Sequence, residues 1–202
     1  MISSVIFDVG NVLVDWSVQS FLRAKGYDES QAADLVGGTL NLEWHSVSDL
    51  GVPLDENVRQ RKAIYPQDAD ALALYRDKWH ETVVGSIDGT VELLQRLAKA
   101  NVDLYAITNF PADQFGPFYE RFGFMNLFQS IVVSGELGLK KPDPRIYALA
   151  LDRFGCDADA SLFIDDRREN CLAAARFGIQ THVFQGPECL AKDLIKRGLL
   201  AG

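Results

Sequence analysis

Short apolar runs alternate along the chain with segments that have the period of an amphipathic helix. The runs are mostly apolar at consecutive positions, which is typical of parallel strands covered on both faces. We expect a strand at each of five runs, namely 5–7, 102–107, 131–133, 162–164 and 182–184. The alternating order of strands and helices predicts a parallel α/β sheet with right-handed crossovers.

Three helices are expected between these strands from their apolar faces and their ends. Residues 90–100 place their apolar side chains on one face. A helix over 144–154 would begin with a proline, which suits a first helical position, and would end at Gly155. Gly178 would end a helix over 171–177 in the same way.

The stretch between Asp15 and about Gly85 departs from this alternation, because it contains no strand-like run. Helical patterns cover 18–25, 29–36, 55–65 and 68–84. The order of elements therefore predicts a helical insertion after the first strand. We expect it to lie over the C-terminal edge of the sheet as a cap.

Composition and charge narrow the function classes. The chain has 202 residues, enough for one core domain with a small insertion. A net charge of −8 argues against nucleic acid or an anionic membrane as a partner. No apolar run approaches the ~18 residues of a membrane span, and Asp8 breaks the first apolar run too early for a secretory leader. The three cysteines form no CxxC pair, so we expect reduced thiols in a cytoplasmic protein.

Polar side chains gather where the predicted strands end. In open α/β sheets, ligands bind outside the carboxyl ends of the strands. A set of carboxylates, a hydroxyl, an amide and a lysine at that edge suits an anionic substrate held by a divalent cation. The residues are Asp8, Thr108, Asn109, Asp165 and Asp166 at strand ends, with Lys140 and Lys141 shortly after the third strand.

Four segments resemble, in order, the four motifs of the haloacid dehalogenase (HAD) superfamily. They are residues 7–16, 106–109, 138–147 and 163–170. The resemblance covers nearly the whole chain, and the stretch without strands falls where the family carries its helical cap. It implies a Rossmann-like α/β core, formed by residues 1–14 and 86–202, with a small helical cap domain formed by residues 15–85.

The resemblance also implies roles for the residues at the strand ends. Asp8 would attack phosphorus and carry the phosphoryl group as an aspartyl phosphate. Thr108 and the backbone amide of Asn109 would hydrogen-bond the phosphoryl oxygens. Lys141 would pair with both Asp8 and the phosphate. Its neighbour Lys140 is expected to be solvated.

A Mg²⁺ site is implied by the same motifs. Its ligands would be Asp8, the Gly10 carbonyl, and one or both of Asp165 and Asp166, since Mg²⁺ prefers oxygen ligands. Asp166 is the preferred direct ligand because it aligns with the principal aspartate of the family. Asn170 would lie behind these ligands and support them.

Gly10 departs from the family pattern. Most phosphatases of the superfamily have an aspartate at this position, which protonates the leaving group and later activates water. Its loss would cost about 10²–10⁴ in rate for a poor leaving group. We hypothesise that Asp15 or a cap residue replaces it.

The cap offers few recognisable substrate contacts. We expect Trp44 and His45 to contact the substrate, although both could instead pack or be solvated within the cap. Asp49 and the pair Trp79-His80 are further residues that could face the substrate.

The leading functional hypothesis is a Mg²⁺-dependent phosphatase that acts on a small phosphorylated metabolite. One alternative is a 2-haloacid dehalogenase, in which Asp8 attacks carbon; that activity usually accompanies a tyrosine at the Gly10 position and an arginine in the cap. The other is a phosphate-binding protein that has lost catalysis. The sequence specifies neither the substrate nor the oligomeric state.

Overall fold

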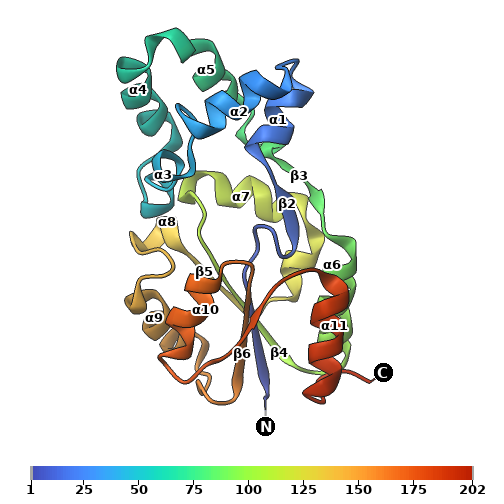
Figure 1. Ribbon diagram of the computed structural model, residues 1–202. Coiled ribbons are helices and arrows are strands. Elements are labelled where there is room, and N and C mark those ends of the chain that lie inside the picture. Colours follow the sequence, from blue (N-terminus) through green and yellow to red (C-terminus); the bar gives the residue numbers. More distant parts are fainter. Residues whose placement is uncertain (1, 202) are drawn as a thin grey trace.

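A five-stranded parallel sheet forms the base of the protein, whose computed structural model describes residues 2–201 (Figure 1). The strands run in the order β5-β4-β1-β6-β7, and each adjacent pair is parallel. They are β1 (Ser4–Phe7), β4 (Asp103–Thr108), β5 (Ser130–Val133), β6 (Ser161–Asp165) and β7 (Gln180–Val183). The predicted α/β fold with five parallel strands is therefore confirmed.

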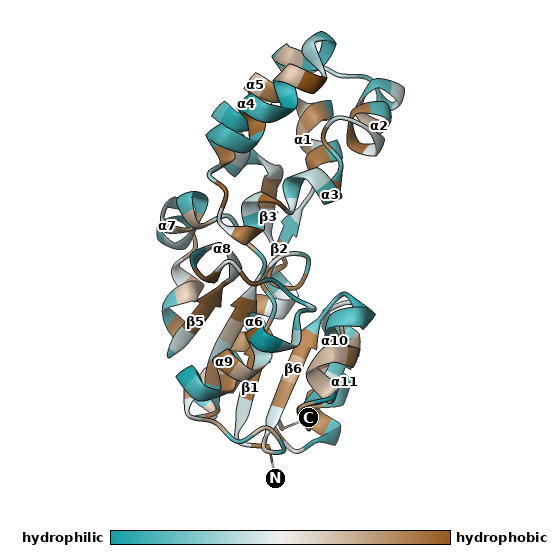
Figure 2. Ribbon diagram, turned by 90° about the vertical axis from the view of Figure 1, so that its left-hand side faces the viewer, coloured by the Kyte–Doolittle hydropathy of each residue, from teal (hydrophilic) through white to brown (hydrophobic). Residues whose placement is uncertain are grey.

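Burial on both faces explains the continuous apolar runs. All four residues of β1 and all five of β6 are buried. Successive side chains of a strand point to opposite faces. Phe7 accordingly packs into one hydrophobic cluster and Ile6 into a second one on the other side of the sheet. Figure 2 shows these strands as apolar bands inside a more hydrophilic exterior.

Helices cover the two faces of the sheet. The cluster on one face takes side chains from α6 (Asp88–Lys99) and α11 (Pro187–Lys196). The other takes them from α9 (Pro144–Phe154) and α10 (Arg168–Ala175). The predicted ends of α9 are confirmed, with a proline in the first turn and Gly155 at φ 63° after the last.

Shorter elements complete the core. After β4 the chain forms α7 (Ala112–Arg121) and the 3-10 helix η4 (Gly123–Leu127). A single turn, α8 (Ser134–Leu137), follows β5. These elements bring the loops after β4 and β5 to the C-terminal edge of the sheet, where the predicted site residues lie.

The segment expected to be wholly helical contains two strands, so that prediction is wrong at both of its ends. β2 (Val14–Trp16) and β3 (Val83–Ser86) form an antiparallel two-stranded ribbon. Each strand is very short and partly exposed. The alternation of Val14, Asp15 and Trp16 in β2 is therefore too brief to predict a strand, and β3 does not alternate. The helix expected over 68–84 likewise ends early, at Asp77.

Helices form a separate layer above the C-terminal ends of the core strands (Figure 1). The α-helices of this layer are α1 (Val18–Ala24), α2 (Glu29–Gly37), α3 (Leu42–His45), α4 (Leu54–Ile64) and α5 (Ala69–Asp77). Short 3-10 turns join them: η1 (Ser48–Leu50), η2 (Pro66–Asp68) and η3 (Trp79–Thr82). We call residues 15–85 the cap segment; its status as a separate domain stays a prediction.

The cap segment rests directly on the core. The backbone NH of Leu54 donates to Oδ2 of Asp113 in α7 at 3.0 Å. Near η1, a Cβ on Gly51 would lie only 2.8 Å from the carbonyl oxygen of Gly135 in α8. The rings of Trp79 and Phe110 meet edge to face at 5.0 Å. Of the helices in residues 2–201, none has the length and apolarity needed to cross a bilayer.

Candidate active site

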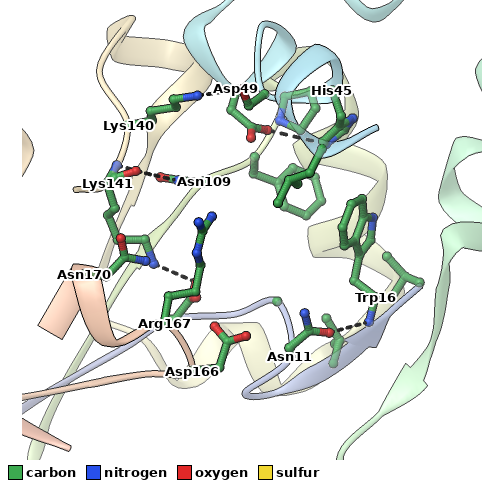
Figure 3. A pocket seen from close by; sticks show the side chains of 18 of the residues that line it. Asn11, Trp16, His45, Asp49, Asn109, Lys140, Lys141, Asp166, Arg167 and Asn170 are labelled. Carbon is green, nitrogen blue, oxygen red and sulfur yellow. Dashed lines mark hydrogen bonds and ion pairs between the residues drawn. The ribbon is translucent and has the colours of Figure 1, made fainter. Parts of the chain in front are cut away.

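A cavity of about 250 Å³ lies between the cap segment and the C-terminal ends of the strands (Figure 3). Its core side is lined by Asp8, Gly10, Asn109, Lys141 and Asp166 among others. Its cap side is lined by residues that include Trp16, His45, Asp49 and Trp79. Four of the residues that the sequence placed at or after separate strand ends therefore meet at one cavity, namely Asp8, Asn109, Lys141 and Asp166.

Lys141 and Asp8 form a buried ion pair at the base of this cavity. Asp8 follows β1 directly, is 7% exposed, and accepts a hydrogen bond from the backbone NH of Val9 at 2.7 Å. The Lys141 ammonium is 2.8 Å from Oδ1 of Asp8 and 2.7 Å from Oδ2 of Asp165. One buried cation thus bridges two carboxylates that come from neighbouring strands.

The side chain of Asn109 holds the backbone of Lys141. Its Nδ2 donates to the Lys141 carbonyl at 3.0 Å, and its Oδ1 accepts from the Lys141 NH at 2.8 Å. This double hydrogen bond joins the end of β4 to the loop after α8. The sequence assigned only the backbone amide of Asn109 a role, and no local signal could have revealed a partner 32 residues away.

Both carboxylate oxygens of Asp165 accept hydrogen bonds from protein groups. It is fully buried, and Nδ2 of Asn170 lies 3.0 Å from each of its carboxylate oxygens. The backbone NH of Arg167 donates to Oδ1 at 2.8 Å. Asp166, in contrast, is half-buried and lines the cavity. The expected supporting place of Asn170 is therefore seen as a contact with Asp165, and Asp166 is the carboxylate of the pair that faces the open space.

Burial controls the protonation of these groups. It raises the pKa of Asp8 to about 8, because the loss of hydration outweighs the attraction of Lys141. Burial, and then the charge of Asp165, raise the pKa of Asp166. Burial acts against the charge of Lys141, but Asp165 and Asp8 overcome it and raise the pKa of that ammonium.

The carboxylates could hold a divalent cation. Ligand oxygens of Asp8, Asp165 and Asp166 all lie within 4.8 Å of one another. Three carboxylates against one ammonium leave an excess of negative charge when all are ionised. Hard oxygen donors of this kind suit Mg²⁺. The donor set therefore fits the metal that the sequence motifs imply.

Gly10 leaves open space at the position where an acid-base side chain was expected. A Cβ there would meet no atom of its surroundings within 4 Å. The hypothesis that Asp15 replaces it is wrong. Asp15 is exposed, pairs with Gly85 in the ribbon, and is not among the residues that line the cavity.

Of each of the two residue pairs in the cap segment that were expected near the substrate, one residue lines the cavity and the other does not. His45 lines the cavity, but Trp44 does not. The Trp44 ring is buried inside the cap segment, where it packs against Tyr75 at 5.5 Å and under the guanidinium of Arg61 at 5.8 Å. Its expected contact with substrate does not fit this position, because its apolar area is used in packing. In the second pair, Trp79 lines the cavity while the His80 side chain is exposed.

Lys140 and Thr108 also differ from the simple expectation. Lys140 is half-buried rather than solvated, and its Nζ donates to Oγ of Ser46 in the cap segment at 2.6 Å. Thr108 is 1% exposed at the end of β4 and lies behind the residues that line the cavity. Its predicted contact with phosphate stays a prediction.

Comparison with curated proteins finds relatives among phosphatases. The chain is 31% identical over 113 residues to flavin mononucleotide hydrolase 1 of Arabidopsis thaliana, across 56% of this chain and 46% of that protein. It is 34% identical over 114 residues to phosphoglycolate phosphatase of Pseudomonas putida, across 54% and 41%. The matched region spans less than half the length of either relative.

Solved structures share the fold at low sequence identity. A HAD-family enzyme of Bacteroides thetaiotaomicron, in complex with magnesium and inorganic phosphate, has a TM-score of 0.71 at 19% identity and covers 92% of this chain and 96% of its own. L-2-haloacid dehalogenase of Xanthobacter autotrophicus has a TM-score of 0.66 at 20% identity, with 100% and 85% covered.

The motifs, the fold and a family model lead to the same assignment. The model is described as haloacid dehalogenase-like hydrolase and matches residues 5–184, which include all the core residues of the cavity named above. The chain therefore belongs to the haloacid dehalogenase-like hydrolase family.

Proposed function

We propose that the protein is a Mg²⁺-dependent phosphomonoesterase that acts on a small phosphorylated metabolite through Asp8. The observation that carries the proposal is the buried Lys141 bridge between Asp8 and Asp165, beneath a cavity with three clustered carboxylates. An ammonium in this position offsets the repulsion between an attacking carboxylate and a phosphate. The phosphatase relatives support the same reaction class.

Each residue of the proposed site has its own role in catalysis. Asp8 carries the nucleophilic oxygen, and Lys141 orients that carboxylate and neutralises charge on the phosphoryl group. The side chain of Asn109 holds the backbone of Lys141 in place. Asn109 and Thr108 would also supply hydrogen bonds to phosphoryl oxygens. Asp8, the Gly10 carbonyl and Asp166 would hold Mg²⁺, with Asp165 beside them. The bound ion would neutralise phosphate charge and favour ionised Asp8.

The size and lining of the cavity support a small substrate. About 250 Å³ of space accommodates a phosphorylated metabolite, whereas a folded phosphoprotein or nucleic acid could not enter a cavity covered by the cap segment. The overall charge of −8 also disfavours a polyanionic partner. Three free cysteines fit the cytoplasmic setting that we propose.

The dehalogenase alternative receives less support from the cavity. The arginine that lines it is Arg167, which belongs to the core. Arg61 of the cap segment is engaged elsewhere, since it donates to the carbonyl groups of Thr39 and Gly38. Among the described residues of the cap segment, none of the cavity-lining side chains is an arginine that could bind a haloacid carboxylate.

The test is phosphate release from a panel of sugar phosphates and p-nitrophenyl phosphate, with Mg²⁺ and with EDTA. We expect release by the wild type to require Mg²⁺ and to fall at least 10³-fold in Asp8→Asn, as when other groups that act in the transition state are lost (about 10²–10⁴). Asp15→Asn is the matched control, because Asp15 is exposed and outside the cavity. Absence of release, with halide release from 2-chloropropionate, would replace the proposal with dehalogenation. Phosphate binding without any turnover would favour the binding protein.

A further inference from the structure

The direction of phosphoryl transfer points to the cap side of the cavity. In phosphoryl transfer the attacking and leaving oxygens lie roughly in line through phosphorus. If Asp8 attacks from the core side, as the proposed function requires, the leaving oxygen faces the cap segment. A group that protonates this oxygen must therefore come from the residues that line the cap side.

Asp49 is the carboxyl group available there. Among residues 2–201, three aspartates line the cavity, and two of them, Asp8 and Asp166, belong to the carboxylate cluster of the core. Asp49 is the third; it lies in η1 and is 5% exposed. Figure 3 shows it across the cavity from Asp166. It is thus separate from the residues that would hold the metal.

Its neighbour His45 is poorly suited to the same task. The indole NH of Trp79 donates to the Tyr75 hydroxyl oxygen at 3.1 Å, and that hydroxyl lies 2.6 Å from Nδ1 of His45. We assign the Tyr75 hydrogen to Nδ1, since the hydroxyl oxygen already accepts from Trp79; this tautomer places the imidazole hydrogen on Nε2. Burial, and then the charge of Lys140, lower the pKa of His45 to about 4, so the ring is neutral and holds that hydrogen tightly.

This chain of hydrogen bonds fixes the His45 ring beside Asp49. Nε2 of His45 faces Oδ1 of Asp49 at 3.6 Å. Oδ1 is buried and has no hydrogen-bond partner among the residues that the structure describes, and the carboxyl group lines the cavity. A buried carboxyl oxygen with an unused hydrogen-bonding capacity is unfavourable unless a further group completes it. A substrate oxygen or water in the cavity would be such a group.

The electrostatic surroundings suit proton exchange near neutral pH. Burial raises the pKa of Asp49 to about 7, although the charges of Lys140 and Lys141 act against it. The groups that face it are His45 and Tyr75 from the cap segment and the two lysines from the core loop. An acid-base catalyst is most efficient when its pKa lies near the working pH.

We propose that Asp49 is the general acid and base of phosphoryl transfer, and that the cap supplies through it the carboxyl group absent at Gly10. This inference rests on the proposed function. In the first half-reaction, the bond from Asp8 to phosphorus forms and the ester P–O bond breaks. The Asp49 proton passes to the leaving oxygen, which departs as an alcohol.

The second half-reaction restores the enzyme. The Asp49 carboxylate takes a proton from water as the water oxygen bonds to phosphorus. The bond between phosphorus and Asp8 breaks, inorganic phosphate forms, and Asp8 is again a carboxylate. Protons and electron pairs balance over the cycle, with water as the second substrate.

The test compares two leaving groups in Asp49→Asn, a near-isosteric change. With an alkyl phosphate such as glycerol 3-phosphate, turnover should fall about 10²–10⁴-fold, because the leaving alkoxide needs a proton. With p-nitrophenyl phosphate, the first nitrophenolate per site should still be released rapidly, followed by slow turnover as the phosphoenzyme accumulates. The limb of the pH–rate profile near pH 7 should disappear. Glu43→Gln is the control, since it removes an exposed carboxylate from α3 of the same cap segment.

A second variant separates chemistry from structure. Added formate should restore alkyl phosphate turnover to Asp49→Ala by occupying the vacated space. The inference would be overturned if Asp49→Asn turned over an alkyl phosphate within about threefold of the wild-type rate. It would also be overturned if Asp49→Asn lost the nitrophenolate burst as fully as it lost turnover and formate failed to rescue Asp49→Ala. Either result leaves the proposed function standing if Asp8→Asn is inactive. A wild-type protein that releases no phosphate would overturn both.

Discussion

Lys141 determines the charge balance of the cavity floor at the scale of a single residue. Its side chain is 1% exposed and contacts Asp8 and Asp165. Lys141→Met would leave two buried carboxyl groups, Asp8 and Asp165, without the ammonium that bridges them. We expect a loss of about 3–5 kcal/mol in the free energy of unfolding at pH 7, the usual effect of breaking a buried ion pair. Urea denaturation in EDTA measures it.

The matched control is the preceding lysine. Lys140 is half-buried and makes one hydrogen bond to Ser46, so Lys140→Met should cost about 1 kcal/mol or less. Equal losses for the two variants would show that the Lys141 bridge is not a specific source of stability.

The sequence could predict only part of the site at this scale. Asp8, Lys141, Asp165 and Asp166 lie in recognisable motifs, and the structure brings their side chains together. The side-chain contact of Asn109 and the place of Asp49 depend on contacts between segments far apart in the chain. No periodicity or local spacing encodes such contacts, so they could be recognised only once the fold had placed the two segments side by side.

The turn η1 carries Asp49 and packs against α8, which makes Gly51 important at the scale of elements. Gly51 has φ +95°, and a Cβ there would lie 2.8 Å from the backbone oxygen of Gly135. Gly51→Ala should therefore both strain the turn and push it away from the core. We expect activity on an alkyl phosphate to fall at least tenfold, because the Asp49 carboxyl group moves away from the leaving oxygen, about the loss that one misplaced acid-base group causes.

Gly26 provides the comparison for this prediction. Its φ of +96° is nearly the same, but a Cβ there would meet nothing within 4 Å. Gly26→Ala should lower stability by about 1–3 kcal/mol through backbone strain alone and leave kcat unchanged. Thermal melting and steady-state kinetics on both variants separate strain from displacement. Parallel effects on kcat would contradict the role given to the contact between η1 and α8.

Elements were predictable where burial imposes a pattern. The five core strands and α9 follow from apolar runs and from the proline and glycine at helix ends. The ribbon of β2 and β3 was missed because each strand is short and partly exposed. Its pairing depends on the cap segment returning to the point where it left the core, which is a property of the tertiary fold.

At the scale of the whole molecule, stability without metal should fall as the pH rises. The pKa of Asp8 increases from 3.8 to about 8 in the folded state, mainly by burial. The folded state therefore binds this proton more tightly than the unfolded state. The resulting stability is complete below about pH 4 and is lost as the pH rises toward 8. Asp49 adds the same trend up to about pH 7.

Mg²⁺ should reverse this trend, because it binds the ionised carboxylates. The increase in melting temperature caused by Mg²⁺ should accordingly be small at pH 5 and large at pH 8. Melting curves at pH 5, 6.5 and 8, in EDTA and in Mg²⁺, test it. In Asp8→Asn the pH dependence in EDTA should flatten and the Mg²⁺ effect should shrink. A pH-independent Mg²⁺ effect would argue against metal binding by these carboxylates.

The ribbon of β2 and β3 restricts how the cap segment can swing. Both crossings of the chain between core and cap run through this one ribbon, on one side of the junction, while η1, which follows α3, packs against α8 on the other (Figure 1). Bending at the ribbon would part the α3 edge first and break the link between Lys140 and Ser46. The entrance to the cavity would then lie beside the Lys140 ammonium group, which no longer donates to Ser46. This charge would attract an anionic metabolite to the entrance, so the association rate constant of the substrate should fall as ionic strength rises.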